Sequence, residues 1–391
     1  MAECNHETRG LVVDLHVDDK YYNNLDIEGF SQMMKSPSYC YKFYWLEAIV
    51  HLISEGKKET TFNEIIDEMI ANAWYSVLQF HIHLSGIVAG KVRDGLERTV
   101  LLLQQLSDLP ANASKTEIKN AIKEHDSALK TFKTQLTNMV PYRALSGFFD
   151  KYSETPEWDR KARMVAYISR VNGYNRLPYT LGESKQLKKE VYFDADWMEM
   201  IQDNTVSILG WIQYEKVKWL QNNNPEVPGL IYKLAPMDER MRKLSRVHKL
   251  WDMVIDVKPV HDVFTDKVIT EKSYDVDHFI PWSFVMNDEL WNLMPMDASL
   301  NRQKHDKLPK WDPFFEKFAS NQYLLYQLIH DEELPDIHQG FEKCYRDNLH
   351  SIWANQELYR KGNSQEEFYN ILSKNMQPIY DSARRQGYQV W

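Results

Sequence analysis

The sequence predicts a mainly α-helical protein with one small β element in its C-terminal part, an α+β fold overall. Two observations carry this prediction. Glycine and proline are sparse, at 14 and 15 in 391 residues, and long stretches place apolar residues at helical spacing. Short β-prone runs, split by polar pieces, occur only at about 258–283.

The predicted helices follow one another along most of the chain. The first, at 36–56, begins with Ser-Pro, is apolar all round and ends at a glycine. The second, at 60–80, begins with Thr61 and Glu64 at the spacing of a capping box. Further helices are expected at about 93–107, 114–138, 194–221, 237–256, 297–306, 313–330 and 365–385.

These elements suggest a division of the chain into two regions. A helical N-terminal region is expected at 1–235, with a role in recognition, gating or dimerisation. A C-terminal region at 236–391 surrounds the β element. The long apolar helices of the first region offer a face for a second copy or for a partner protein, and the sequence does not decide between them.

Composition limits the function classes. The net charge is −9 and the pI about 5.8, so the chain is not a general polyanion binder, and any contact with nucleic acid requires a local basic face. The cysteines Cys4, Cys40 and Cys344 form no CxxC pair, which argues against a disulfide framework and a cysteine zinc site. Without a signal peptide or a long apolar run, we expect a cytoplasmic protein with no membrane span.

The residues that carry chemistry lie in the segment 275–309. Asp277 and His278 are adjacent, and Asn301 and His305, at i and i+4, share one face of the predicted helix. Aspartate, asparagine and histidine together offer two oxygens and one nitrogen, which suits Mg²⁺, Mn²⁺ or also Ni²⁺ or Zn²⁺. His278 then remains as a base, since an imidazole takes up a proton near neutral pH.

A base beside a metal ion held by few protein ligands is what hydrolysis of a phosphodiester requires. The metal stabilises charge on the phosphate and on the leaving oxygen, and the base activates water. Arg302, Lys304 and Lys307 lie on or just after the same helix, where a phosphate backbone can use them.

A second basic stripe lies on the helix at 237–256. Arg242, Arg246 and Lys249 fall at i, i+4 and i+7. The stripe has two interpretations: an ordinary solvated face, or a clamp for a nucleic-acid backbone ahead of the β element.

These residues resemble the motif of HNH nucleases, the ββα-metal fold. That family has an acidic residue or His before a His at the end of the first hairpin strand, then an Asn, then a His or Asn on the helix. Here the matching positions are Asp277-His278, Asn292 and Asn301, and the spacings of fourteen and nine residues match the family. The motif is most similar to the HNH lobe of RNA-guided CRISPR effectors, and Asn301-x-x-x-His305 also resembles the paired helix ligands of colicin-type DNases.

The resemblance covers about 258–312 and leaves the rest of the chain unassigned. It implies a ββα-metal nuclease module with Asp277 and Asn301 as metal ligands and His278 as general base. Asn292 is expected to brace the loop that presents His278. His305 is left open as a third ligand, a phosphate contact or a bystander.

The resemblance also implies the cofactor. One Mg²⁺ or Mn²⁺ is expected per site, and an asparagine at the helix position favours Mg²⁺ over transition metals. No structural zinc is expected, because residues 264–267 read Phe-Thr-Asp-Lys where some members have Cys-x-x-Cys.

We therefore expect a metal-dependent endonuclease that hydrolyses DNA, most simply duplex DNA, in a bacterial cytosol. A role in restriction or phage defence rests on analogy alone. Two alternatives stay open. One is a ribonuclease, because metal-and-base chemistry does not exclude RNA. The other is a nucleic-acid-binding subunit of a larger defence complex with a gated HNH site.

A run of aromatic residues in the first predicted helix also has two interpretations. Tyr39, Tyr41, Phe43, Tyr44 and Trp45 can stack nucleic-acid bases. At helical spacing such residues more often fill a core, and a core is what we expect here.

Overall fold

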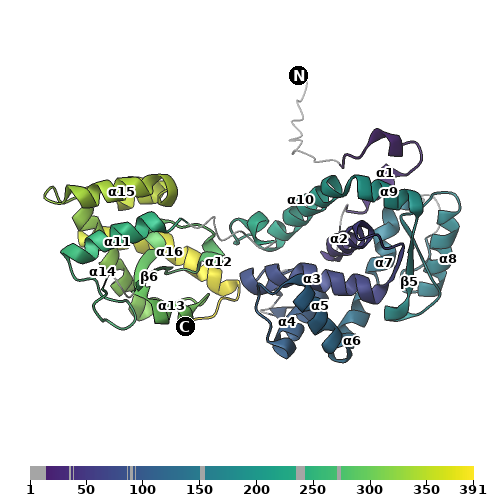
Figure 1. Cartoon of the computed structure of the whole chain (residues 1–391), viewed down its shortest axis with the longest axis horizontal. Coiled ribbons are helices and arrows are strands. Elements are labelled where there is room, and N and C mark those ends of the chain that lie inside the picture. The colour runs from purple at the N-terminus through teal and green to yellow at the C-terminus, as the bar shows by residue number, and fades with distance from the viewer. Residues whose placement is uncertain are drawn as a thin grey trace, which may run out of the picture. The chain divides into compact units, whose positions relative to one another are not determined.

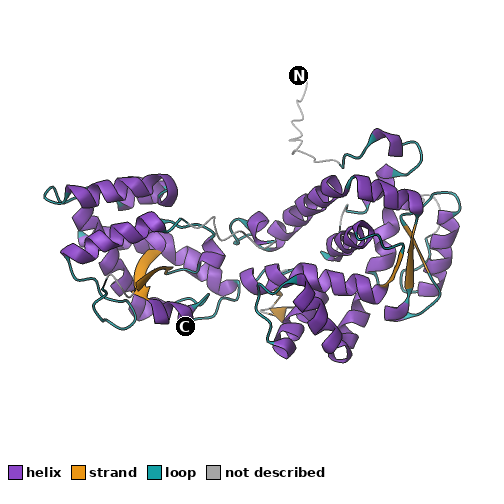
Figure 2. Cartoon of the chain, in the orientation of Figure 1, coloured by secondary structure: helices purple, strands orange, loops and turns teal. Residues whose placement is uncertain are grey.

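The computed structural model describes residues 15–34, 37, 39–85, 87–88, 91–92, 94–149, 155–234, 243–270 and 274–391. These residues are mostly helical, with a few small antiparallel sheets (Figure 2). The chain forms two compact units, Met1–Pro225 and Glu226–Trp391, which places the boundary before the expected one at 235. Among the described helices, none is both long and apolar enough to cross a bilayer.

The first unit is organised around α2 and α3, which pack on each other and on several neighbours (Figure 1). The helix α2 is apolar nearly all round, and its side chains Phe43, Tyr44 and Trp45 are buried as expected of a core. Thr61 caps α3 by accepting a hydrogen bond from the Glu64 backbone N–H, which is one half of the predicted capping box, whereas the Glu64 carboxylate accepts from the Thr60 hydroxyl. The helices of this unit are α1 (Ile27–Gln32), α2 (Tyr41–Ser54), α3 (Phe62–Phe80), α4 (Gly95–Ser107), α5 (Lys115–Glu124), α6 (Asp126–Leu136), α7 (Val140–Arg143), α8 (Lys161–Asn172), α9 (Ala195–Asp203) and α10 (Thr205–Asn223).

Strands also occur in the first unit, and the expectation that they are confined to 258–283 is wrong. An antiparallel sheet has the order β1 (Glu59–Thr61), β5 (Glu190–Phe193) and β4 (Tyr179–Leu181). A separate pair joins β2 (Ile87–Val88) to β3 (Lys91–Val92). These strands are too short for a period-two pattern to stand out from the sequence around them.

Two predicted helices are each divided. The segment 114–138 breaks at His125 between α5 and α6, and the segment 194–221 breaks at Asn204 between α9 and α10. At the second break, the Asn204 amide donates to the Met200 carbonyl and accepts from the Asp18 backbone N–H. A side chain that bonds to backbone in this way competes with the helical hydrogen bonds.

The second unit wraps helices around one hairpin (Figure 1). Helices α11, α13 and α14 contact the hairpin strands, and α11 buries Val247, Leu250, Trp251 and Val254 in the common core. Each such side chain contributes about 1.5–3 kcal/mol on burial. The elements are α11 (Ser245–Val257), β6 (Tyr274–His278), α12 (Trp282–Val285), β7 (Leu293–Asp297), α13 (Ala298–Lys304), α14 (Trp311–Ile329), α15 (Pro335–Asn348) and α16 (Gln365–Arg385).

The hairpin register fixes which side chains face the helix that follows it. Strands β6 and β7 are antiparallel, with Tyr274 opposite Asp297 and His278 opposite Leu293. Along β6, Tyr274, Val276 and His278 are buried, whereas Asp275 and Asp277 are partly exposed. The two carboxylates therefore share one face of the strand.

Candidate active site

The two carboxylates of β6 face polar side chains of α13. Asn301 Nδ2 donates to Asp275 Oδ2 at 3.2 Å, and Lys304 Nζ donates to Asp277 Oδ2 at 2.8 Å. The structure thus brings Asn301 to the carboxylate face of β6, where Asp277 also lies. Asp275 did not emerge from the sequence, although its signal was present: it stands two residues before Asp277, so the two share a face of the strand.

His278 is the last residue of β6, and its side chain is 1% exposed. Its Nε2 lies 3.1 Å from the Asn287 carbonyl oxygen and 3.1 Å from Asp288 Oδ1, and the hydrogen bond goes to the carbonyl. Because both neighbours are acceptors, Nε2 is the nitrogen that donates, and in the neutral ring the lone pair is on Nδ1. Within the described part of the chain, Nδ1 has no hydrogen-bond partner. A nitrogen in this state is the proton acceptor that a general base requires.

Asp288 is a second residue that sequence reasoning missed. Its Oδ2 accepts from the Lys243 backbone N–H at 2.8 Å, and its carbonyl accepts from Asn348 Nδ2 at 2.8 Å. Segments distant in sequence therefore fix this carboxylate beside Nε2 of His278. A carboxylate there supports the Nε2-protonated tautomer and stabilises the positive charge that the ring gains when Nδ1 takes a proton.

The Asn292 side chain holds the loop after His278 by hydrogen bonds to its backbone. Its Oδ1 accepts from the Ile280 N–H and its Nδ2 donates to the Ile280 carbonyl, both at 2.8 Å. The Asn292 carbonyl also accepts from the Phe279 N–H at 2.8 Å. Since the side chain is buried and both of its polar ends are engaged, Asn292 holds the backbone that leaves His278 and has no group left for a substrate.

The structure corrects the role predicted for Lys304. A phosphate contact needs an exposed ammonium, but this side chain is fully buried. Its Nζ donates to Asp277 Oδ2 and to the His278 carbonyl, each at 2.8 Å. Lys304 therefore ties the helix to the end of β6 at the candidate base.

The structure also corrects the position of His305. A ligand pair on the helix requires Asn301 and His305 to share one helix face, but α13 ends at Lys304 and His305 has a φ of 48°. Its side chain is 74% exposed and lies beside Asp306, with 3.7 Å between Nδ1 and Oδ2. His305 is thus not on the Asn301 face of the helix.

The basic residues predicted to contact nucleic acid have different surroundings. Arg242 lies outside the described residues. Arg246 is engaged within its own unit, with Nη1 donating to the Lys343 carbonyl at 2.8 Å and lying 3.0 Å from Asp347 Oδ2. Lys249 and Arg302 are exposed and Lys307 is half-buried, and their contact with nucleic acid stays a prediction.

A turn ahead of the hairpin stabilises the start of α13. The buried Asp262 accepts from the backbone N–H groups of Phe264 and Thr265 through Oδ1, and from that of Asp297 through Oδ2. Asp297 in turn caps α13 by accepting from Ser299 and Leu300, and the Ser299 hydrogen bond lowers the pKa of the Asp297 carboxyl. These bonds set the helix that carries Asn301.

Two carboxylates and one amide are the metal donors that this geometry offers, from Asp275, Asp277 and Asn301. All can supply hard oxygen ligands, the type that Mg²⁺ and Mn²⁺ prefer. The described residues contain no cluster of three or more His, Cys, Asp or Glu side chains placed to hold a metal. A site here therefore depends on the asparagine.

Comparison with protein families assigns this part of the chain. Residues 262–310 match the HNH endonuclease family. The HNH segment contains β6, β7 and α13 with the side chains of the candidate site, whereas the Lys243 backbone N–H and the Asn348 side chain fix Asp288 from outside it. The match confirms the family inferred from the motif and implies nuclease chemistry, and the rest of the chain has no assignment. Comparison with curated proteins and with solved structures gave no match.

Proposed function

We propose that this protein is a metal-dependent endonuclease that hydrolyses DNA, with His278 as the general base. One observation carries the proposal. His278 Nε2 is engaged by the Asn287 carbonyl, while Nδ1 has no partner in the described chain and stands at the end of the strand that bears Asp275 and Asp277. His278 and the two carboxylates thus lie on one short strand of the segment that matches the HNH family, with the His278 side chain on the face opposite to Asp275 and Asp277.

The residues present fit a divalent ion of the Mg²⁺ type. Asp277 and Asn301 would hold it, and Asp275 is a third candidate because it already contacts Asn301. When bound, such an ion stabilises negative charge on the phosphate and on the leaving oxygen. His305 no longer belongs to this set.

The remaining steps belong to side chains of the site. His278 Nδ1 accepts the proton of the attacking water, and Asp288 and the Asn287 carbonyl keep Nε2 protonated while the ring is charged. Asn292 holds the loop, and Lys304 holds Asp277 and the His278 backbone. Because the His278 ring is almost fully covered, water and substrate reach Nδ1 only when the side chains over it move aside, which supports a gated site.

Duplex DNA is the proposed substrate, since nucleases of this family generally cleave DNA. A role in restriction or phage defence in a bacterial cytosol rests on the resemblance of the motif. The test is incubation of the purified chain with DNA and RNA of the same sequence, with Mg²⁺, with Mn²⁺ and with EDTA. Metal-dependent cleavage of DNA alone supports the proposal. Cleavage of RNA alone would replace it with a ribonuclease, and cleavage in EDTA would contradict the metal requirement.

A further inference from the structure

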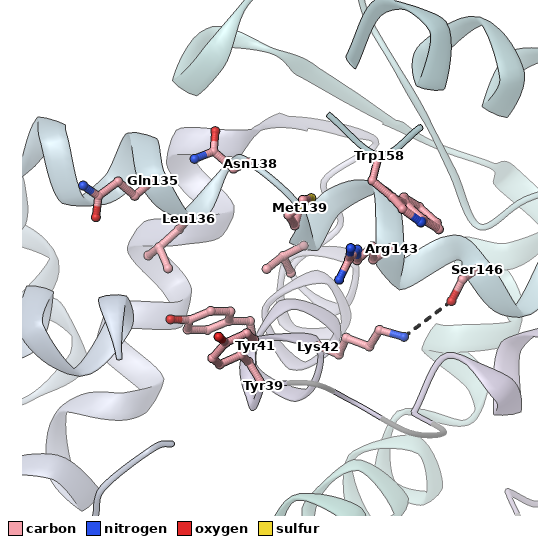
Figure 3. A pocket seen from close by; sticks show the side chains of 11 residues that line it. Tyr39, Tyr41, Lys42, Gln135, Leu136, Asn138, Met139, Arg143, Ser146 and Trp158 are labelled. Atoms are coloured by element: carbon pink, nitrogen blue, oxygen red, sulfur yellow. Dashed lines mark hydrogen bonds between the residues drawn. The ribbon is translucent and has the colours of Figure 1, made fainter. Parts of the chain in front are cut away.

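A pocket in the first unit lies apart from the HNH segment. It has a volume of about 370 Å³, within the range of roughly 300–1,000 Å³ typical of small-molecule sites. It is lined by Tyr39, which precedes α2, by Tyr41 and Lys42 at the start of α2, and by the end of α6, Arg143 of α7 and Trp158 (Figure 3). The pocket is therefore built from four segments of one unit.

The described lining of the pocket includes two cations, Lys42 and Arg143. Lys42 Nζ is 3.4 Å from Ser146 Oγ, and the Arg143 guanidinium lies over the Trp158 ring at 5.3 Å from its centroid. Arg143 Nε is buried and lacks a hydrogen-bond partner in the described part of the chain. None of the described lining residues is an aspartate or glutamate.

Two fully buried lysines of the same unit are neutralised by carboxylates. Lys133 Nζ lies 2.6 Å from Asp67 Oδ1 and 2.7 Å from Asp126 Oδ1, and Lys216 Nζ lies 2.9 Å from Glu47 Oε2. In a chain of net charge −9, carboxylates are plentiful. Lys42 and Arg143 are two partly buried cations with no carboxylate among the described lining residues, and a bound anion would stabilise both.

The electrostatic interaction between Lys42 and Arg143 also favours a bound anion. Burial lowers the pKa of the Lys42 ammonium, and the charge of Arg143 lowers it further. Each positive charge therefore disfavours the charged form of the other side chain. An anion between them reverses this effect, because it attracts both.

Aromatic rings complete the pocket. The rings of Tyr39 and Tyr41 stack with centroids 5.5 Å apart and planes at 17°. Tyr41 is fixed because its hydroxyl accepts from the Gly95 backbone N–H at 2.8 Å, whereas Tyr39 is 55% exposed. Figure 3 shows the two tyrosines on one side and Lys42, Arg143 and Trp158 toward the other. A flat apolar surface thus lies next to the paired cations.

We propose that this pocket binds a mononucleotide, with its phosphate between Lys42 and Arg143 and its base against Tyr39. Base–aromatic stacking contributes about 1–3 kcal/mol per base, and phosphate bound to arginine makes strong charge-assisted hydrogen bonds. The proposal adds a ligand site to the first unit and does not depend on the nuclease activity of the second.

The test is calorimetric titration of the full chain with AMP, GMP, CMP and UMP, beside adenosine and inorganic phosphate. We expect at least one mononucleotide to bind with a Kd below about 1 mM, and its nucleoside at least about tenfold more weakly, since the charge-assisted bonds are lost. Lys42→Gln and Arg143→Gln should each raise the Kd at least about tenfold. Tyr39→Ala, at an exposed position that folding tolerates, should raise it about fivefold or more.

The matched control is Lys123→Gln, which removes one positive charge from an exposed position of α5 outside the pocket. It should leave the Kd within about twofold, as expected of a distant surface charge. The proposal is overturned if no mononucleotide binds, or if binding survives both cation variants and Tyr39→Ala. It is also overturned if a ten-nucleotide single strand binds while the mononucleotides do not, because the surface would then serve nucleic acid.

Discussion

Asn292→Ala is the substitution whose cost follows most directly from the structure. The change removes two hydrogen bonds of 2.8 Å and leaves the N–H and carbonyl of Ile280 without their buried partner. An unsatisfied buried polar group costs about 1–3 kcal/mol, so the two together predict a loss of about 2–6 kcal/mol in the free energy of unfolding. This is a large part of the roughly 5–15 kcal/mol that stabilises a typical domain.

The assay is urea unfolding of the full chain, followed by tryptophan fluorescence, with the transition of each unit fitted separately. Asn370→Ala is the control, because Asn370 is exposed on α16 and its replacement should change stability by less than about 0.5 kcal/mol. Cleavage by Asn292→Ala should also fall at temperatures where the protein is still folded, since the loop after His278 loses its brace. A loss of stability below about 1 kcal/mol would refute the claim that this amide holds the loop.

Three further predictions test other parts of the structure. Lys304→Met should cost up to about 3 kcal/mol in urea unfolding, because it leaves the partly buried Asp277 carboxylate without its partner. Adding Asp277→Asn should recover part of the loss, and a cost that this second change does not reduce would contradict the pair. Asp275→Asn should raise the Mg²⁺ concentration for half-maximal cleavage about tenfold or more, and an unchanged titration would remove Asp275 from the ligand set. Burial lowers the pKa of His81 from 6.5 to about 4, so the unfolded state binds the proton first, and the free energy of unfolding should fall by up to about 3 kcal/mol as the pH drops from 6.5 to 4. His81→Asn should flatten this fall, whereas His16→Asn, at an exposed position, should not. Equal slopes of stability against pH in all three proteins would contradict the prediction.

The core of the candidate site was open to prediction from the sequence because its residues lie in one short segment. Asp277-His278, Asn292 and Asn301 keep family spacings, so residue type and position were enough to group them. The brace formed by Asn292 is local as well, since it joins residues at a sequence separation of 12. Local contacts of this kind can be predicted from residue type and spacing.

The remaining features depend on contacts that sequence spacing does not reveal. Asp288 is fixed by Lys243 and Asn348, at separations of 45 and 60 residues. The sheet in the first unit pairs Glu59 with Tyr192, and neither strand carries a clear pattern of its own. His305 was misplaced because the end of α13, one residue earlier, is set by local backbone conformation and not by the i and i+4 spacing.

The role of His278 is the central claim, and cleavage of supercoiled plasmid by His278→Ala tests it most directly. The purified full chain, the variant and a His350→Ala control, which changes an exposed histidine of the same unit, would be incubated with Mg²⁺ or Mn²⁺ and run on agarose. We expect metal-dependent nicked or linear DNA from the wild type and the control. The variant should be slower by at least about 10²–10⁴-fold, the usual contribution of a general base. Cleavage by His278→Ala at a rate close to that of the wild type would contradict the account.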